Sequence, residues 1–291
     1  MDRSRQIELA RVFRAMHDGP RLLLLPNAWD VASARLYEVE GFLAVGTTSA
    51  GIAATLGFAD GERMTLADNL AVCRRIVAQV AIPVSVDLEA GYRGCLDGLS
   101  ESAADVMASG AVGINIEDSA KAGCGGRGAA ALLELSVQAE RIATVRRVAD
   151  RAGVPLVINA RTDVFLADGD ATEERLAEAI ERGNAYRDAG ADCVFVPDTG
   201  ALGEPEIAAL AKRIRAPLNV IAGPTTPCVK RLEALGVARL SFGPRPMRAA
   251  LHALRVMARE WRETGAYGHM IACGSLSYGE VNAWFGERPA P

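Results

Sequence analysis

The sequence lacks the features that mark nucleic-acid-binding, secreted and membrane proteins. Its 291 residues carry 32 basic and 36 acidic side chains, a formal net charge of -4, so no strong field attracts a polyanion or an anionic lipid surface. The first residues alternate charged and apolar side chains at helical spacing, without the apolar core and cleavage site of a signal peptide. No apolar run is long enough to span a bilayer. We therefore expect a cytoplasmic protein without a nucleic-acid or membrane partner.

The placement of cysteine and histidine excludes two further kinds of site. The cysteines form no C-x-x-C pair, which favours reduced thiols over a disulfide framework or a structural zinc site; they are Cys73, Cys95, Cys124, Cys193, Cys228 and Cys273. The three histidines, His17, His252 and His269, lie outside the strand ends predicted below. No imidazole is therefore available at those ends as a zinc ligand or as an obvious base.

Short apolar runs alternate with stretches of helical spacing along most of the chain. With 50% hydrophobic residues, the chain can bury one large core. We predict eight strands, at residues 22–25, 43–46, 83–87, 113–117, 155–160, 193–197, 218–222 and 239–242. Eight such strands within about 220 residues are typical of a closed barrel rather than of an open doubly wound sheet. The predicted fold class is α/β, a single (β/α)8 TIM-type barrel that forms one domain over residues 1–291.

Helical spacing fills most of the intervals between these strands. The predicted helices occupy residues 66–80, 102–109, 138–152, 172–189, 204–213 and 226–235. Four intervals share one cue, a glycine followed by a small or β-branched residue just before the next strand, at Gly110, Gly153, Gly190 and Gly236. Glycine at this place closes a helix in the left-handed conformation, so the cue marks repeated helix-to-strand turns.

About 45 residues follow the eighth predicted strand, which is more than one barrel needs. They contain an apolar helix at residues 248–262 and a further segment at residues 277–285. We predict a C-terminal helical extension from about residue 248. Its aromatic and apolar residues either pack against a neighbouring subunit or cover the chain's own barrel.

Acidic residues gather at the predicted carboxyl ends of the strands, where such barrels build their active sites. Asp87 and Glu89 end the third strand two positions apart, and hence on one side of it. The other polar residues here are Glu117 and Asp118 on the fourth strand, Asn159, Arg161 and Asp163 on the fifth, and Asp60 in the loop after the second. Converging carboxylates repel one another unless a cation neutralises them, and oxygen ligands favour Mg²⁺ or Mn²⁺ over zinc. The sequence therefore predicts a hard divalent metal, although a solvated strand end or a salt bridge to an arginine also explains Asp87 and Glu89.

Two further features of these ends suit a carboxylate ligand. Arg161 follows a buried apolar strand, so its guanidinium is expected to emerge at the mouth and to pair with a substrate carboxylate through two parallel hydrogen bonds. An ion pair with Glu89 or Glu117 is the other interpretation, and the two roles can coexist. Residues 47–51, Thr-Thr-Ser-Ala-Gly, are small enough to let backbone N–H groups approach an oxyanion.

At these positions the chain resembles the isocitrate lyase/phosphoenolpyruvate mutase family. The resemblance runs from about residue 24 to residue 257 and rests on four motifs in this order: TSAGIAATLGFADGE, DLEAGY at residues 87–92, INIEDS and NARTDVF. It implies barrels that exchange C-terminal helices between the subunits of a dimer and often assemble as tetramers. It also implies Mg²⁺ that stabilises a pyruvate-like enolate while a C–C or P–C bond is broken or made. We therefore expect a homodimer or homotetramer with swapped C-terminal helices.

The resemblance also assigns roles to individual residues. Asp87 corresponds to the direct metal ligand, and three further acids hold the metal through water: Asp60, Glu89 and Glu117. Arg161 corresponds to the clamp for the substrate carboxylate, and Thr48, Ser49 and Ala50 to the segment that binds the other carboxylate and keto oxygens. Tyr92 lies beside this centre, where it either carries a proton or only packs.

The sequence departs from the family in the loop after the fourth strand. The lyase branch has K-K/R-C-G-H there, whereas residues 120–128 read AKAGCGGRG: Cys124 and the following glycine are kept, but Gly123 and Gly126 replace the base and the histidine. Cys124 is either the proton donor to the leaving enolate, with a pKa lowered by a nearby cation, or an incidental cysteine. The mutase branch has an asparagine in this loop, and none lies between residues 118 and 135. The glycines predict a mobile lid over the substrate.

The predicted function is that of a Mg²⁺-dependent carbon–carbon lyase or decarboxylase. Its substrate is a small α-keto or 2-hydroxy dicarboxylate, such as oxaloacetate or a methylisocitrate-like acid, and its product is pyruvate or its enol. The alternatives are a phosphonopyruvate-type P–C bond enzyme and a non-catalytic keto-acid binder. A sugar-phosphate barrel with a phosphate site at residues 223–225 and 243–245 is a further alternative, but it does not explain the acids.

Overall fold

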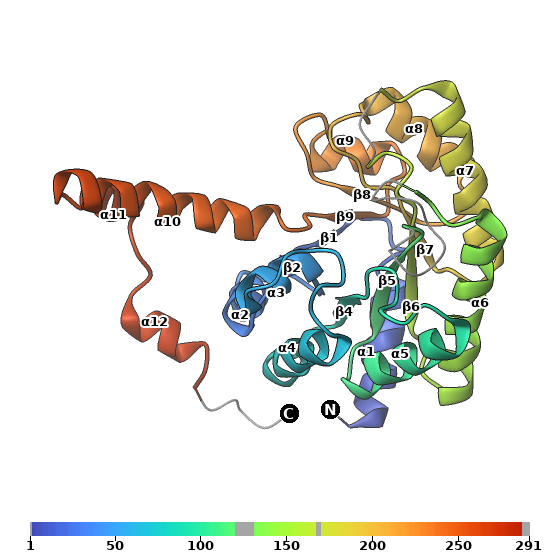
Figure 1. Cartoon of the computed structure of the whole chain (residues 1–291), viewed down its shortest axis with the longest axis horizontal. Coiled ribbons are helices and arrows are strands. Elements are labelled where there is room, and N and C mark those ends of the chain that lie inside the picture. The colour runs from blue at the N-terminus through green and yellow to red at the C-terminus, as the bar shows by residue number, and fades with distance from the viewer. Residues whose placement is uncertain (1, 120–130, 167–169, 287–291) are drawn as a thin grey trace.

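A computed structural model describes residues 2–119, 131–166 and 170–286 and shows a (β/α)8 barrel (Figure 1). Its strands are β1 (Leu23–Leu25), β2 (Asn27–Ala28), β3 (Val45–Thr47), β4 (Val84–Asp87), β5 (Gly113–Glu117), β6 (Val157–Arg161), β7 (Cys193–Phe195), β8 (Leu218–Ile221) and β9 (Arg239–Ser241). All paired strands are parallel, and their order is β1-β9-β8-β7-β6-β5-β4-β3-β2. The predicted fold class is confirmed.

The barrel closes through its first strand, which is interrupted at Pro26. β1 pairs with β9 and β2 pairs with β3, so the two short strands are halves of one strand that joins both edges of the sheet. Proline has no N–H to give to a neighbour. Its carbonyl still accepts a hydrogen bond from the Gly46 N–H at 2.9 Å. The nine short strands therefore make one eight-stranded barrel.

Helices surround this barrel and continue beyond it. They are α1 (Arg3–Ala15), α2 (Val31–Val39), α3 (Ser49–Leu56), α4 (Leu66–Gln79), α5 (Leu96–Ala108), α6 (Leu135–Ala152), α7 (Glu173–Asp188), α8 (Glu204–Arg213), α9 (Val229–Ala234), α10 (Arg245–Thr264), α11 (Gly268–Cys273) and α12 (Tyr278–Ala283). The glycines predicted to precede strands all have positive φ: 89° at Gly110, 66° at Gly153, 108° at Gly190 and 86° at Gly236.

Helix α1 closes the end of the barrel at which the strands begin. Its residue Phe13 is fully buried, and a Cβ placed on Gly113 of β5 would lie 2.7 Å from the Phe13 ring. Glycine at position 113 therefore leaves room for the Phe13 ring inside the barrel. Because Phe13 fills the barrel interior at this end, a ligand can enter the interior only at the other end, where the strands finish.

The C-terminal extension leaves the barrel instead of covering it. α10 projects away from the barrel and carries α11 at its far end, and α12 then runs back toward α2 (Figure 1). One face of α10 exposes Leu251, Leu254 and Trp261 to solvent at 53%, 52% and 42%. The extension reaches the barrel again near Trp284, whose carbonyl accepts a hydrogen bond from Arg35 at 2.8 Å. Within the described residues, no helix is long and apolar enough to cross a membrane.

Candidate active site

A cavity of about 210 Å³ opens where the strands end, and it contains most of the predicted site residues. Its polar lining comes from Asn27, Thr48, Ser49, Asp60, Asp87, Asn115, Arg161 and Ser241, with Ala50 beside them. Its apolar lining comes from Leu166, Phe195, Pro197, Ile221 and Pro244. A wider apolar groove of about 560 Å³ lies at the other end of the barrel, between residues 16–24 and 40–43, and holds none of the predicted site residues.

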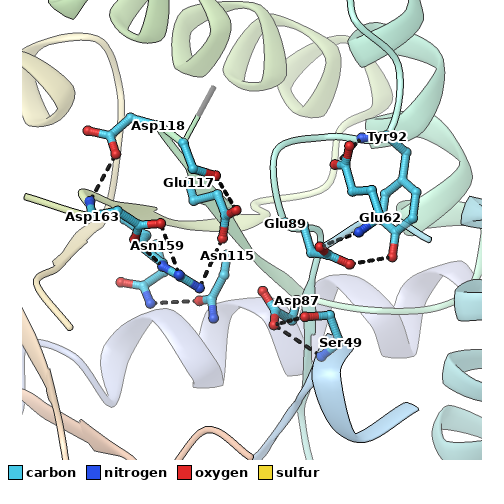
Figure 2. Close-up of polar contacts among 12 residues, drawn as sticks. Ser49, Glu62, Asp87, Glu89, Tyr92, Asn115, Glu117, Asp118, Asn159 and Asp163 are labelled. Atoms are coloured by element: carbon cyan, nitrogen blue, oxygen red, sulfur yellow. Dashed lines mark hydrogen bonds and ion pairs between the residues drawn. The ribbon is translucent and has the colours of Figure 1, made fainter. Parts of the chain in front are cut away.

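Asp87 ends β4 at the bottom of this cavity and is buried, at 9% exposure. Its Oδ2 accepts two hydrogen bonds from Ser49, 3.1 Å from the backbone N–H and 2.8 Å from the hydroxyl (Figure 2). Its Oδ1 is buried and has no partner among the described residues. Burial raises the pKa of Asp87, and the charge of Arg161 opposes that rise. A carboxylate oxygen in this state is ready to bind a cation.

Glu89 lies next to Asp87 and is held by two loops (Figure 2). It accepts hydrogen bonds from the Glu62 N–H at 2.8 Å and from the Tyr92 hydroxyl at 2.9 Å. In turn, the Glu62 carboxylate accepts one from the Tyr92 N–H at 2.8 Å. These three residues are the described non-glycine residues with positive φ, which is 49° at Glu89, 58° at Glu62 and 62° at Tyr92. Because such backbone conformations are unfavourable, the hydrogen bonds must hold them in place.

Burial and the nearby charge of Asp87 raise the pKa of Glu89 to about 8. The same loop raises the pKa of the Tyr92 phenol, first through burial and then through the charge of Glu89. Tyr92 therefore stays protonated and acts as a donor to Glu89. Its hydroxyl also accepts a hydrogen bond from Asn69 at 3.1 Å, and Tyr92 is not among the residues that line the cavity.

Arg161 ends β6 between two acids. Its Nη1 lies 2.9 Å from Glu117 Oε2, its Nη2 lies 3.0 Å from Asp163 Oδ2, and its Nε donates to Asp163 Oδ1. Burial acts to lower the pKa of Arg161, but the charges of Asp163 and Glu117 keep it above its ordinary value. The predicted ion pair with Glu117 is therefore present. Arg161 also lines the cavity, where the second N–H group of Nη1 and of Nη2 can still bind a ligand.

The predicted metal ligands fit a cation that keeps much of its water. No group of three or more His, Cys, Asp or Glu side chains within residues 2–119, 131–166 and 170–286 is arranged to enclose a metal ion. Mg²⁺ is commonly bound through only one or two carboxylates and retains several waters. The unpartnered Oδ1 of Asp87 suits one direct bond, and Asp60 at the cavity rim, with Glu89 and Glu117 nearby, suits contacts through water.

The predicted lid and its Cys124 lie outside the described residues. The residues that flank this segment meet at the cavity side of the barrel. Ser119 and Leu132 form an antiparallel bridge, and the Leu133 N–H donates to the Asp118 carbonyl at 2.8 Å. Asp118 itself is buried against the Tyr186 hydroxyl, 2.7 Å away, which indicates a structural role.

Several residues of this site were not among the predicted site residues, among them Asn27 and Ser241 of the cavity lining. Two others, Glu62 and Asn115, lie inside motifs noted above, Glu62 in FADGE and Asn115 in INIEDS. Glu62 joins the two acidic loops, and Asn115 lines the cavity beside Asp87. The signal for Asn115 is its position two residues before Glu117, since alternate residues of a strand face the same side.

Comparison with known proteins gives consistent matches over nearly the whole chain. The family model for phosphoenolpyruvate phosphomutase matches residues 13–262. The chain is 36% identical over 248 residues to an uncharacterised protein of Mycobacterium tuberculosis, covering 85% of this chain and 87% of that one. It is 29% identical over 281 residues to the 2-methylisocitrate lyase of Escherichia coli, covering 94% and 92%. A crystal structure of a Burkholderia cenocepacia protein described as a lyase or mutase has a TM-score of 0.87 at 34% identity, covering 97% of each chain.

The raised pKa of Glu89 leads to a prediction about stability and pH. In the folded protein without metal the pKa is about 8, above the ordinary value of 4.5. The stability that comes from holding this proton is complete below about pH 4.5 and is lost as pH rises through about 8. Glu89→Gln carries no such charge. Relative to wild type, its free energy of unfolding should therefore increase by at least about 1 kcal/mol between about pH 5 and about pH 9.

Urea denaturation in EDTA at the two pH values measures this change, with Glu181→Gln on the exposed surface of α7 as the control. The control should follow wild type at both values. Mg²⁺ should also raise the melting temperature of wild type more at the higher pH, because ionised carboxylates bind it better. A constant difference between Glu89→Gln and wild type would contradict the buried, protonated state of Glu89.

Proposed function

The chain belongs to the phosphoenolpyruvate phosphomutase family, and on that premise we propose that it is a Mg²⁺-dependent carbon–carbon lyase or decarboxylase. Its substrate in this proposal is a small α-keto or 2-hydroxy dicarboxylate, cleaved through a pyruvate enolate. The family includes lyases and mutases, among them the 2-methylisocitrate lyase that matches this chain over 281 residues. The observation that carries the proposal is the unpartnered carboxylate oxygen of Asp87, in the same small cavity as Arg161.

In the proposed site, Asp87 would hold Mg²⁺ directly, and Asp60, Glu89 and Glu117 would hold it through water; Mn²⁺ is an alternative. When bound, the metal would act as a Lewis acid that draws charge from the keto oxygen. Ser49 binds Oδ2 of Asp87, which leaves the unpartnered Oδ1 for the cation. Tyr92 and Glu62 orient Glu89. We therefore assign Tyr92 a positioning role in this proposal, since its hydroxyl is already committed to Glu89.

The other side chains bind and orient the acid. Arg161, fixed by Glu117 and Asp163, pairs with one substrate carboxylate. Thr48 caps α3, and Ser49 and Ala50 begin it, so the helix dipole favours the second carboxylate or the keto oxygen there. The Thr48 and Ser49 N–H groups already donate to the Ala28 carbonyl and to Asp87, which leaves the Ala50 N–H to bind the acid. The apolar side of the cavity excludes water from the enolate, which would otherwise be protonated early.

Three other functions remain candidates with different consequences. A phosphonopyruvate-type enzyme would use the same metal and clamp on a P–C bond. A keto-acid binder without turnover needs Asp87, Glu117 and Arg161 but no proton donor. A sugar-phosphate enzyme would not need the buried acids around Asp87, so family membership and the acids both favour the keto-acid functions.

The proposed function is tested by pyruvate release from a panel of dicarboxylates that includes oxaloacetate and methylisocitrate. Wild type with Mg²⁺ should release pyruvate from at least one acid, and EDTA should abolish the release. Asp87→Asn keeps the shape of the side chain but removes its charge, so turnover should fall by about 10²-fold or more. Asp188→Asn, at the exposed end of α7, is the control and should match wild type. Full turnover after metal removal would overturn the proposal, and release of phosphate from phosphonopyruvate would favour the P–C alternative.

Arg161→Lys should weaken the binding of carboxylate substrates, because an ammonium group cannot form two parallel hydrogen bonds to a carboxylate. The expected loss in kcat/KM corresponds to about 2 to 3 kcal/mol. Arg182→Lys is the matched control: Arg182 is also a buried arginine paired with an acid, Asp118, but it does not line the cavity. It should lower the melting temperature and leave KM nearly unchanged. An unaltered KM for Arg161→Lys would show that Arg161 does not bind the substrate and serves only in its ion pairs.

Cys124 distinguishes the two branches of the proposal. If Cys124 protonates the leaving enolate, Cys124→Ser should lower turnover by about 10²-fold or more with little change in affinity. If the reaction is a decarboxylation, the metal suffices as the electron sink and most of the rate should remain. Cys228→Ser, an exposed cysteine after β8, serves as the control. Turnover of Cys124→Ser equal to wild type on every cleaved acid would remove Cys124 from the catalytic residues.

We also propose that α10 pairs with a second copy of the chain, in a homodimer or homotetramer with exchanged C-terminal helices. The support is the exposed apolar face of α10 and its projection from the barrel (Figure 1). Leu254→Glu should then convert the oligomer to monomers in sedimentation experiments, because it places a charge in a buried contact. Arg259→Glu also adds an acid to α10, at an exposed arginine, and should leave the oligomer intact. A monomeric wild type would refute the pairing.

A further inference from the structure

The interior of the barrel below the cavity is polar, although branched apolar residues usually fill such barrels. Its most unusual member is Arg239 of β9, at 1% exposure. It precedes Ser241, a cavity residue, by two positions and hence points into the barrel. Arg239 has no acid within ion-pair distance in the described part of the chain. Its Nε and Nη1 have no partner there either.

A buried charge with no acid in contact is costly, and the charge of Asp87 acts on Arg239 only at longer range, so Arg239 needs an explanation. Within the described residues, its one side-chain hydrogen bond runs from Nη2 to Asn115 Oδ1 at 3.4 Å. The same oxygen accepts a second hydrogen bond, from Asn159 Nδ2 at 2.7 Å (Figure 2). Arg239 therefore acts on the cavity through the amide of Asn115.

The charge of Arg239 determines which way this amide faces. Two neighbouring asparagines can pair in either direction, because each side chain has one donor end and one acceptor end. In the reversed pair, Asn115 would present its NH₂ group to Arg239, and a guanidinium has only donors. The observed direction leaves Asn159 Oδ1 buried and without a partner among the described residues. Arg239 thus enforces an orientation that the asparagine pair alone does not require.

With its oxygen turned to Arg239, Asn115 presents its Nδ2 to the cavity. Asn115 is 7% exposed and lines the cavity, whereas Asn159 is fully buried and does not. No acceptor for Asn115 Nδ2 is present in residues 2–119, 131–166 or 170–286. Asp87 is its register partner on β4. The site therefore contains a neutral donor placed among acids.

We propose that Asn115 is a substrate-binding residue whose Nδ2 donates to an anionic oxygen of the keto acid, and that Arg239 is the residue that positions it. An aspartate at position 115 would neutralise Arg239, yet it would turn an acceptor toward the substrate anion. The neutral amide therefore favours binding of the anionic ligand, but it leaves the charge of Arg239 without a neutralising partner at this position. This inference rests on the proposed function, because it takes the keto acid as the ligand.

The test uses oxalate with Mg²⁺ as the probe, since oxalate presents the paired oxygens of a pyruvate enolate and is not turned over. Isothermal titration of the intact protein measures its affinity. Asn115→Leu removes the donor at similar volume and should weaken the affinity for oxalate by about 10-fold or more. Arg239→Met should weaken this affinity by about threefold or more, and it should cause no further loss of affinity in the Asn115→Leu background.

Two controls separate positioning from general packing. Asn219→Leu removes a fully buried asparagine from the same interior, and it should lower the melting temperature with oxalate affinity within about threefold of wild type. Arg239→Lys keeps a cation that has only donors and should retain most of the affinity that Arg239→Met loses. If Asn115→Leu does not fold, the comparison of Arg239→Met with Arg239→Lys still tests the positioning role.

The outcomes are distinct from those of the proposed function. Oxalate binding that depends on Asn115, in a protein that cleaves no acid of the panel, would reject the lyase and keep this inference. Overturning it requires a wild type that does not bind oxalate, an Asn115→Leu protein that binds it as tightly as wild type, or equal losses in Arg239→Met and Arg239→Lys.

Discussion

The structure of this site depends on the burial of several acids at one end of a barrel. Each oxygen must find a donor, because a carboxylate that loses water without replacement is strongly destabilised. Arg161 balances Glu117 and Asp163, and the Tyr92 hydroxyl with the Glu62 N–H satisfies Glu89. Ser49 satisfies half of Asp87. The remaining oxygen of Asp87 has no donor among the described residues. A cation that binds this oxygen would therefore stabilise the site most.

This arrangement also explains why unfavourable backbone conformations collect around Glu89. Residues with positive φ cost free energy unless the surrounding structure holds them. Here the loop with Glu62 and the loop with Glu89 and Tyr92 hold each other through three hydrogen bonds. The result is an acidic cluster whose two loops are cross-linked in the absence of a ligand. Preorganisation of this kind would lower the cost of gathering like charges around the proposed metal.

The sequence predicted the features that follow from hydrophobic periodicity, and it missed those that depend on one contact. All eight barrel strands were predicted, because buried parallel strands are continuous apolar runs. The split at Pro26 and the eight-residue α3 were not, since α3 is built of small residues with no polar face. At the site, strand parity predicts that Asp87, Glu117 and Arg161 share one side; Asp87 and Arg161 line the cavity, and Glu117 lies 2.9 Å from Arg161. The same parity places Asn115 on the face of Glu117, but the contact between Arg239 and the amide of Asn115 depends on the direction of that amide, which no spacing reveals.

The size and lining of the cavity bear on which acids the site can take. Pockets for drug-sized ligands measure about 300 to 1,000 Å³, and this cavity measures about 210 Å³. In the proposed function part of this volume would hold Mg²⁺ and its waters, which leaves space for an acid of few carbons. The side opposite Asp87 is formed by Phe195, Pro197 and Ile221, and Arg161 is the only cation among the described residues that line the cavity. A second carboxylate must therefore reach the Ala50 N–H at the start of α3, so the described lining favours dicarboxylates of few carbons over acids with a third carboxylate.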